Sequence, residues 1–236
     1  MQESTFEPVV INLLLARLPV EEAERVLQSC ERVTLGFGDI LCEADQPFLH
    51  VYFPLTGFVS RVTALAGHPG LELGLVGNEG MLGATLSLGV NGAPMRAVVQ
   101  GAGAALKMTA SQLRHELSRC PCLRQTLNRY LFILLAQLAQ IAACARFHEI
   151  EPRLACWLLM THDRAHADYF HLTHAYLADM LGVRRSGISI AAGALQQRGL
   201  IRYTRGEINI LDRQGLEAAS CACYAAMRQD YAQGFA

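Results

Sequence analysis

Two short segments with apolar residues at helical spacing flank Gly182-Val183 in the C-terminal part of the chain. The apolar positions of the first are Tyr176, Leu177, Met180 and Leu181. Those of the second, on one face of a helix, are Ile188, Ala191, Ala192 and Leu195. Thr173 has the side chain of an N-cap, and Gly182 can adopt the left-handed conformation that ends a helix. The pattern predicts a helix-turn-helix.

The second helix of such a unit, here residues 184–198, lies in the major groove of DNA with its N-terminal residues against base edges. Outside its apolar stripe lie Arg185, Ser186, Ser189, Ile190 and Gly193, and Arg184 at its start is a further candidate for DNA contact. Residues 201–204 and 207–211 alternate around Arg205-Gly206, which predicts a β-hairpin. A hairpin after a recognition helix is a wing that reaches phosphate. The candidate phosphate contacts are Thr173, His174, Thr204 and Arg205.

Five arginines and no acidic residue occur from Arg184 to Arg205, although the whole chain has a net charge of -1. The basic run is therefore a local feature. An ordinary helical hairpin with surface arginines is the alternative interpretation. The predicted wing and the local charge favour double-stranded DNA as the partner.

The N-terminal half has a different sequence pattern, rich in glycine and in short alternating runs. Thirteen of the twenty glycines fall between residues 36 and 103, among short alternating runs. These runs are 33–35, 50–53, 58–62, 71–75, 97–99 and 105–108. Many short strands with glycine turns predict a compact β-barrel or roll. Residues 6–30 are predicted to be helical, with Pro19 opening a second helix.

A long helix is predicted from Cys122 to about Ile150, because this stretch contains no glycine or proline. Steps of four and three relate Leu127, Leu131, Leu134, Leu138, Ile141 and Ala145. This heptad seam predicts a homodimer through two copies of the helix. The alternative is burial against the chain's own β-domain, which Leu123, Tyr130 and Leu135, off the seam, could also provide.

Glu151-Pro152 is expected to end the long helix. A buried helix at 153–160, a polar linker at 161–171 and a final helix at 216–231 complete the prediction. The expected fold is α+β. Residues 1–120 form the β-roll domain, 121–150 the dimerisation helix, and 151–236 the winged helix-turn-helix domain.

Composition adds that the chain is globular, with 52% hydrophobic and 17% charged residues. The longest apolar run near the centre, 130–135, is too short to span a membrane, and no secretory signal is visible at the N-terminus. We expect a cytoplasmic protein without membrane contact, whose eight cysteines are reduced.

The order of roll, long helix and winged helix resembles the family of the cyclic-AMP receptor protein and the fumarate-nitrate regulator (CRP/FNR), over nearly the whole chain. The motifs that carry the resemblance are 38–41 (GDIL), 52–57 (YFPLTG), 181–185 (LGVRR) and 199–201 (GLI). The resemblance implies a cyclic-nucleotide-binding-like jelly roll and a homodimeric transcription regulator. It also implies a two-fold symmetric operator and RNA polymerase as a further partner.

Two departures from the family concern the effector. Met81 stands where cyclic-AMP binders have the ribose carboxylate, and Met95 stands at the phosphate arginine, with Arg96 one place along. A shift of one residue along a strand points the side chain to the opposite face, so Arg96 would not reach the cyclic phosphate. We therefore expect no tight cyclic-AMP binding. The positions to examine for another ligand are Glu79, Met81, Leu82 and Arg96. The N-terminal part has only Cys30 and Cys42, so no iron-sulfur cluster is expected, whereas a haem sensor stays open.

The resemblance also assigns positions on the recognition helix. Arg185 aligns with an arginine that reads guanine through O6 and N7. Ser186 replaces a frequent glutamate, and Ser189 aligns with a further surface position. Ile190 stands where a basic residue is frequent, and it can pack on a thymine methyl. Arg184 occupies the place of a serine cap. The half-site is therefore expected to differ from the familiar one.

Other constellations give weaker hypotheses. Cys120 and Cys122, and likewise Cys221 and Cys223, have the wrong spacing for a zinc knuckle, so no metal site is expected. A thiol redox switch at Cys221 and Cys223 remains open. The histidines and aspartates of 162–174 leave a His/Asp metal-dependent hydrolase as a remote alternative, although no enzyme is expected. A ligand-binding or protein-interaction module that uses a winged helix without sequence-specific DNA binding is the nearer alternative.

Overall fold

The computed structural model describes residues 11–64, 66–68 and 70–235. After a 3-10 turn, Leu15–Arg17, and helix α1, Val20–Gln28, the chain enters two antiparallel sheets. The first has the order β1-β7-β3, with β1 Glu31–Leu35, β7 Gly103–Thr109 and β3 His50–Pro54. The second has the order β2-β6-β4-β5, with β2 Ile40–Cys42, β6 Arg96–Gly101, β4 Phe58–Thr63 and β5 Leu71–Val76. A second 3-10 turn, Ala84–Leu88, lies between β5 and β6.

The two sheets enclose one apolar core, as the alternating sequence predicts for a β-roll. On β3, Val51 and Phe53 are fully buried and pair with Met108 and Leu106 of β7. Helix α2, Ala110–Arg119, closes the roll and begins with a capping box in which Thr109 and Gln112 exchange hydrogen bonds. The structure confirms the predicted α+β architecture and adds β2, a short strand that the sequence pattern did not predict.

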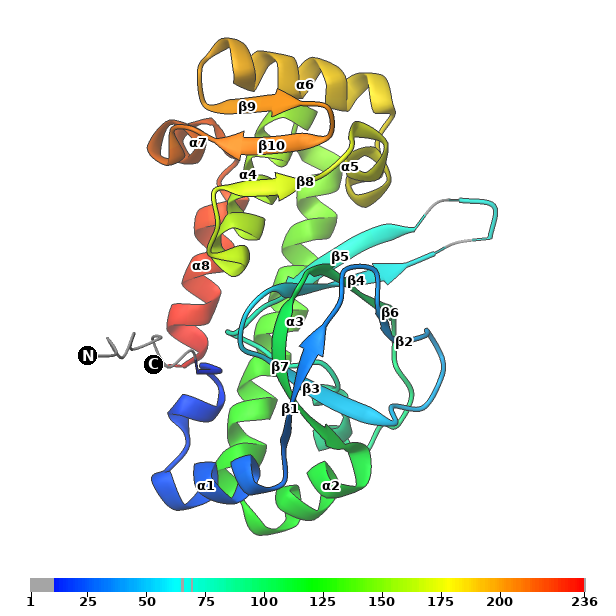
Figure 1. Cartoon of the computed structure of the whole chain (residues 1–236), viewed down its shortest axis with the longest axis vertical. Helices are drawn as coiled ribbons and strands as arrows, with labels where there is room; N and C mark the ends of the chain where they lie inside the picture. The colour runs from blue at the N-terminus through cyan, green and yellow to red at the C-terminus, as the bar shows by residue number, and fades with distance from the viewer. Residues whose placement is uncertain (1–10, 65, 69, 236) are drawn as a thin grey trace, which may run out of the picture.

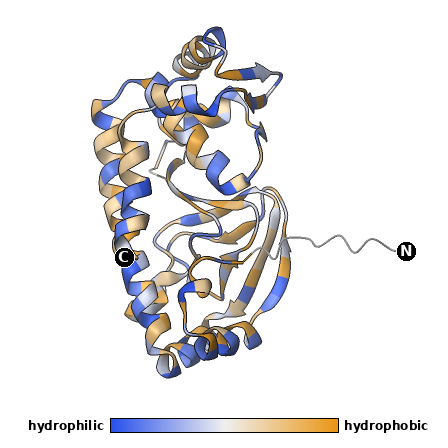
Figure 2. Cartoon of the chain, turned by 90° about the vertical axis from the view of Figure 1, so that its left-hand side faces the viewer, coloured by the Kyte–Doolittle hydropathy of each residue, from blue (hydrophilic) through white to orange (hydrophobic). Residues whose placement is uncertain are grey.

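Helix α3, Pro121–Phe147, runs behind the roll toward the C-terminal unit (Figure 1). Its first turn is capped from α1, because the Glu22 carboxylate accepts hydrogen bonds from the backbone amides of Cys122 and Leu123 at 3.3 and 3.0 Å. Leu123, Leu127 and Tyr130 are fully buried in the roll core. Helix α8, Cys223–Gly234, packs alongside α3 (Figure 2).

The heptad seam predicted on α3 is wrong in its assignment of faces. Leu127 and Leu134 belong to the roll core, and half-buried Leu131 packs against it. Ile141 packs on the core of the C-terminal unit, and of the six predicted positions only Ala145 is exposed. Leu135, an alternative candidate for burial, is instead 66% exposed. Periodicity gives the spacing of an apolar face but not which of two apolar faces meets the roll.

By length and composition alone α3 could cross a membrane, since its most apolar 18-residue window has a mean hydropathy of 1.6. It is the single helix of that kind in the part of the chain that the structure describes. One side of α3 lies in the roll core and its C-terminal half borders the second core, but only 22% of that window is buried within the chain.

The C-terminal unit consists of helices and a small sheet. Its helices are α4 Ile150–Ala165, α5 His174–Leu181, α6 Arg185–Gln197 and α7 Arg213–Ala219, followed by α8. Its strands, in the order β8-β10-β9, are β8 Tyr169–His171, β10 Glu207–Ile210 and β9 Ile201–Thr204. The second hydrophobic core lies here and includes Leu158, Leu177, Ile188 and Leu195.

Several predicted boundaries need correction. Glu151-Pro152 does not end the long helix, because α3 ends at Phe147. Pro152 lies in the first turn of α4, where a backbone amide has no acceptor within the helix and the missing N–H of proline costs nothing. The predicted polar linker 161–171 is instead the end of α4 followed by β8. The helix expected over 6–18 is reduced to the turn Leu15–Arg17 among residues 11–18, and its first part lies outside the described residues.

A buried carboxylate joins the roll to the C-terminal unit. Glu72 of β5 accepts a hydrogen bond from Trp157 Nε1 of α4 at 2.7 Å and another from the hydroxyl of Ser60 on β4. Its side chain is buried, and burial raises its pKa above the ordinary value of 4.5, although the two hydrogen bonds oppose that rise. The folded state therefore favours the protonated acid more than the unfolded chain does.

This shift predicts a specific pH dependence. The pKa of Glu72 is raised in the folded state. Its favourable contribution to the free energy of unfolding is therefore fully present below pH 4.5, and it is lost as the pH rises through the folded pKa. Glu72→Gln does not titrate, so the variant should gain stability relative to the wild type between about pH 5 and about pH 8. Urea unfolding at both pH values measures the difference, with Glu24→Gln on the exposed face of α1 as control. A constant difference across this range would contradict the assignment.

Candidate DNA-binding surface

The helix-turn-helix forms as its sequence predicts. The Thr173 side chain accepts a hydrogen bond from the amide of Tyr176 at 3.2 Å and caps α5. Gly182 ends α5 with φ 63°, and a Cβ at this position would lie 2.9 Å from Leu71 Cδ1 of the roll. Glycine is therefore favoured by the left-handed turn, whereas Leu71 Cδ1, at the end of a flexible side chain, could move aside for a Cβ. The predicted apolar stripe of α6 is buried.

The opposite face of α6 is open. Its first turns expose all five of the side chains singled out from the sequence, which are Arg184, Arg185, Ser186, Ser189 and Ile190. Ile190 is 75% exposed, so its side chain is available for an apolar contact such as a thymine methyl. Hydrogen-bonding, cationic and apolar groups thus share one helical face.

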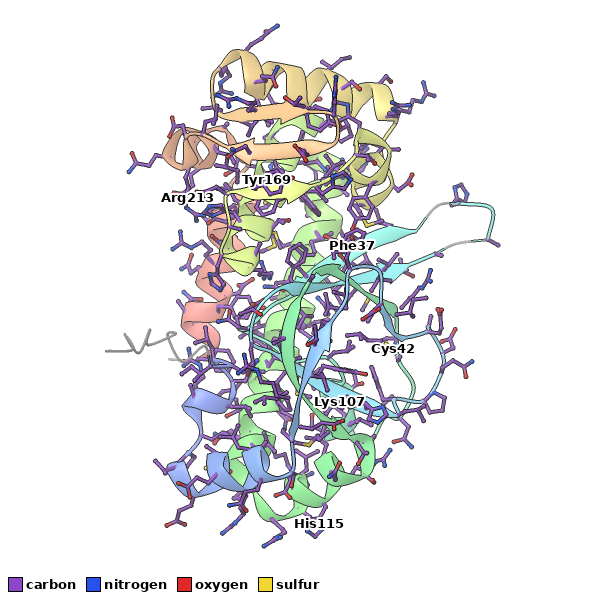
Figure 3. The ribbon with its side chains drawn as sticks, viewed as in Figure 1. Phe37, Cys42, Lys107, His115, Tyr169 and Arg213 are labelled. Carbon is purple, nitrogen blue, oxygen red and sulfur yellow. The ribbon has the colours of Figure 1, made fainter. Side chains whose placement is uncertain are left out.

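The wing is a hairpin of β9 and β10 with a two-residue turn. Arg205 and Gly206 both have positive φ, 51° and 87°, the backbone of a type I′ turn that matches the strand twist. Thr204 and Arg205 at this tip are exposed. Strand β8 completes the sheet, with Tyr169 Oη donating to Glu207 Oε1 at 2.6 Å (Figure 3).

Four of the five arginines in the basic run are available for a ligand. Arg198 is held by Glu151 of α4 at 2.9 Å. Arg184, Arg185, Arg202 and Arg205 are exposed and make no ion pair within the described residues. The free positive charge therefore concentrates at the start of α6 and on the wing.

His174, predicted from the sequence to contact phosphate, lies between the wing and the recognition helix. Its ring stacks on Tyr203 of the wing with centroids 4.0 Å apart, and Nδ1 lies 3.0 Å from Ser189 Oγ on α6. Nε2 is buried without a partner among the described residues. Burial, with a smaller effect from Arg185, lowers the pKa of His174, so the ring is neutral at pH 7. His174 thus connects the wing to the recognition helix.

The predicted effector residues do not come together. Met81 and Leu82 border a cavity of about 40 Å³ inside the roll. Glu79 instead pairs with Arg164 of α4 at 2.8 Å, and Arg96 pairs with Glu43 at 3.3 Å on the surface. Arg61, which the sequence reading missed, is the cation at this cavity: it is 6% exposed, and its Nε has no partner among the described residues. Its position inside the roll depends on strand register, which the sequence did not reveal.

The His/Asp-rich stretch is organised by hydrogen bonds. His162 contacts Asp168 at 2.6 Å, and Asp163 pairs with Arg213 of α7 at 2.7 Å (Figure 3). In the described part of the chain these residues form no group of three potential metal ligands. Their present contacts are thus hydrogen bonds and ion pairs with one another and with α7.

The helix-turn-helix with its exposed basic face and its wing forms a winged-helix domain of the DNA-binding type, next to a β-roll. Residues 152–219 match the family described as Crp-like helix-turn-helix domain. No curated protein matches the chain significantly in sequence.

Solved structures share the fold. FixK2 from Bradyrhizobium japonicum has a TM-score of 0.69 at 17% identity, over 82% of this chain and 98% of that one. The c-di-GMP-responsive regulator CLP of Xanthomonas campestris has a TM-score of 0.66 at 17% identity, over 81% and 99%. A CRP/FNR-family regulator of Thermus thermophilus has a TM-score of 0.62 at 22% identity, over 80% and 98%. Residues 152–219 therefore form a Crp-like helix-turn-helix domain, and the chain shares the fold of these solved regulators.

The position of His174 generates a prediction. His174→Ala removes an aromatic stack and a hydrogen bond, so it should lower the free energy of unfolding by about 1–2 kcal/mol. Because the ring is neutral, the salt dependence of DNA binding should keep its slope. Arg205→Ala, the matched variant at the wing tip, should leave stability unchanged and reduce that slope by about one. Urea unfolding and binding titrations at several salt concentrations measure both. A lower slope with normal stability in His174→Ala would make His174 a phosphate contact.

Proposed function

We propose that this protein acts as a homodimer that binds a two-fold symmetric DNA site, with α6 of each subunit in the major groove. The exposed face of α6 carries the proposal. Arg185 is the reader of guanine, Ile190 contacts a thymine methyl, and Ser186 and Ser189 complete the base contacts. Arg184, Thr173 and the wing residues Thr204 and Arg205 contact phosphate. A regulator of this kind works in the cytoplasm, with RNA polymerase as a further partner.

The remaining apolar face of α3 supports the dimer. Phe132 and Leu135 are 67% and 66% exposed, and Ala139 and Ala142 on the same side are also exposed. Their spacings of three, four and three residues form a heptad pattern on the side away from the roll. Two copies of this face would bury side chains that are otherwise in water. This proposed seam replaces the one predicted from the sequence, of which Leu127 and Leu134 are buried in the roll core.

The roll is proposed to work without cyclic AMP. A cavity of about 40 Å³ is far smaller than the roughly 300–1,000 Å³ of ordinary ligand sites. The roll nevertheless touches the DNA-binding unit through Glu72–Trp157 and through Leu71 beside Gly182. A groove of about 730 Å³ between the β4–β5 hairpin and the start of α6 is lined by His68, Ser186 and Ile190. A shift of this hairpin would therefore change access to the base-reading residues.

Selection of bound sequences from a random duplex pool tests the proposed function. The wild type should enrich a two-fold symmetric motif with half-sites about 34 Å apart. Arg185→Ala should bind about 1–3 kcal/mol more weakly and lose its preference at one base pair of each half-site. Arg32→Ala, an exposed arginine of β1, is the control. An unchanged motif in Arg185→Ala would refute the guanine contact, and an absence of enrichment would favour the protein-interaction alternative.

A charge on the exposed face of α3 tests the dimer. Leu135→Lys should dissociate the dimer, because it places a cation in an apolar seam, and sedimentation velocity should then show monomers. Leu88→Lys makes the same change at a side chain that is 60% exposed outside α3 and should leave the dimer intact. A dimeric Leu135→Lys protein would place the contact elsewhere.

A further inference from the structure

Three thiols and one imidazole converge where the C-terminal end of α3 meets the start of α8. The side chains are Cys144, His148, Cys221 and Cys223, and their potential ligand atoms all lie within 4.8 Å of one another. Cys144 Sγ is 3.6 Å from Cys221 Sγ, and Cys223 Sγ is 3.3 Å from His148 Nδ1. None of the contacts proposed for DNA binding or dimerisation uses these residues.

The distances fit a single tetrahedral ion. With metal–sulfur bonds of about 2.3 Å and metal–nitrogen bonds of about 2.0–2.1 Å, a tetrahedron has sulfur–sulfur edges near 3.8 Å and sulfur–nitrogen edges near 3.6 Å. The two short separations of 3.6 and 3.3 Å approach these values. An iron-sulfur cluster places its own iron and sulfide core between the thiolates and needs a wider arrangement.

Local structure orients the four ligands toward one point. Cys144 and His148 are one helical turn apart, so they lie on one face at the end of α3. Cys221 and Cys223 flank Ala222, the N-cap of α8, and the Tyr224 amide donates to the Cys221 carbonyl at 3.1 Å to close the turn. This turn directs both thiols to the same side.

The surroundings are those of a metal site with an open approach. Cys221 and Cys223 are buried, Cys144 is half-buried, and His148 is exposed, so an ion could enter from the His148 side. Gln140 Nε2 donates a hydrogen bond to Cys223 Sγ at 3.0 Å, the kind of contact that orients a ligating thiolate. All eight cysteines are free in the structure.

We propose that Cys144, His148, Cys221 and Cys223 bind one Zn²⁺ ion as a structural site. The donor set Cys₃His is characteristic of zinc, and four protein ligands leave no position for a substrate. The ion would connect α3 to the chain that follows the winged helix, where the Cys221 amide also donates to the Pro152 carbonyl of α4 at 3.3 Å. Zinc binding thus stabilises the position of the DNA-binding unit on α3.

This proposal replaces the sequence-based expectation that the chain has no metal site. The two halves of the site are separated by 77 residues between Cys144 and Cys221, so no short motif marks them. The Cys-x-Cys spacing, which is wrong for a zinc knuckle, becomes adequate when the other two ligands come from a different helix.

Metal analysis of the full-length protein purified under reducing conditions tests the site. The wild type should contain about one zinc per chain, and Co²⁺ exchanged into it should give the absorption of a tetrahedral, thiolate-bound ion. Cys144→Ala and Cys223→Ala should lose the metal, and His148→Ala should bind it at least about tenfold more weakly. Cys122→Ala, at the opposite end of α3, is the matched control and should keep both signals. Zinc-free wild type should unfold at lower temperature than the loaded protein.

The same measurements can overturn the proposal. Wild-type protein with less than about a tenth of a zinc per chain and no cobalt spectrum would reject it. Equal zinc in Cys144→Ala and Cys122→Ala would mean adventitious binding. Cys156→Ala tests a different set of ligands, because Cys156 is also buried in this core. If this variant loses zinc while His148→Ala keeps it, the fourth ligand is the Cys156 thiolate and not the imidazole. Metal content is measured without DNA, so its outcome is independent of the proposed operator binding.

Discussion

The burial of one side of α3 in the roll core constrains most of the molecule. Leu123, Leu127 and Tyr130 fix the rotation of this helix about its axis, and Glu22 fixes its start. Because a helix is stiff over 27 residues, its C-terminal turns then have determined directions. Ile141 must face the core of the winged helix, Phe132 and Leu135 must face outward, and Cys144 and His148 must face α8. The packing of one side of α3 against the roll thus determines which residues face the winged-helix core, which face outward and which face α8.

The contact between the two cores couples the roll physically to the C-terminal unit. Phe58 and Leu75 of the roll strands are buried within the core of the C-terminal unit, and Glu72 is buried between Ser60 and Trp157. A buried carboxylate with two donors holds one relative position, since displacement would leave a polar group without partners. A change in strand position inside the roll would therefore be transmitted to α4 and to the turn at Gly182.

Within the winged helix, rigidity and recognition are assigned to different residues. His174 and Tyr203 stack between α5 and the wing, and Arg198 is held by Glu151, so these groups fix the shape of the surface. Arg184, Arg185 and Arg205 are left free to meet DNA. The separation is physically reasonable, because a side chain that already has partners within the protein must give them up to meet a new ligand, whereas a free guanidinium retains its full capacity for phosphate and guanine.

The sequence by itself determined the elements with strong local signals. Alternation and glycine spacing specified the roll, the capped segments around Gly182 specified the helix-turn-helix, and Arg205-Gly206 specified the wing turn. These features depend on residues close in sequence, where period, caps and positive φ act directly. Tertiary structure decided which apolar face of α3 is buried, that His174 is held between wing and helix, and that Glu79 and Arg96 do not share a pocket. It alone brought Cys144 and His148 to Cys221 and Cys223, because their proximity depends on how α8 packs against α3, and no local pattern records the meeting of segments so far apart.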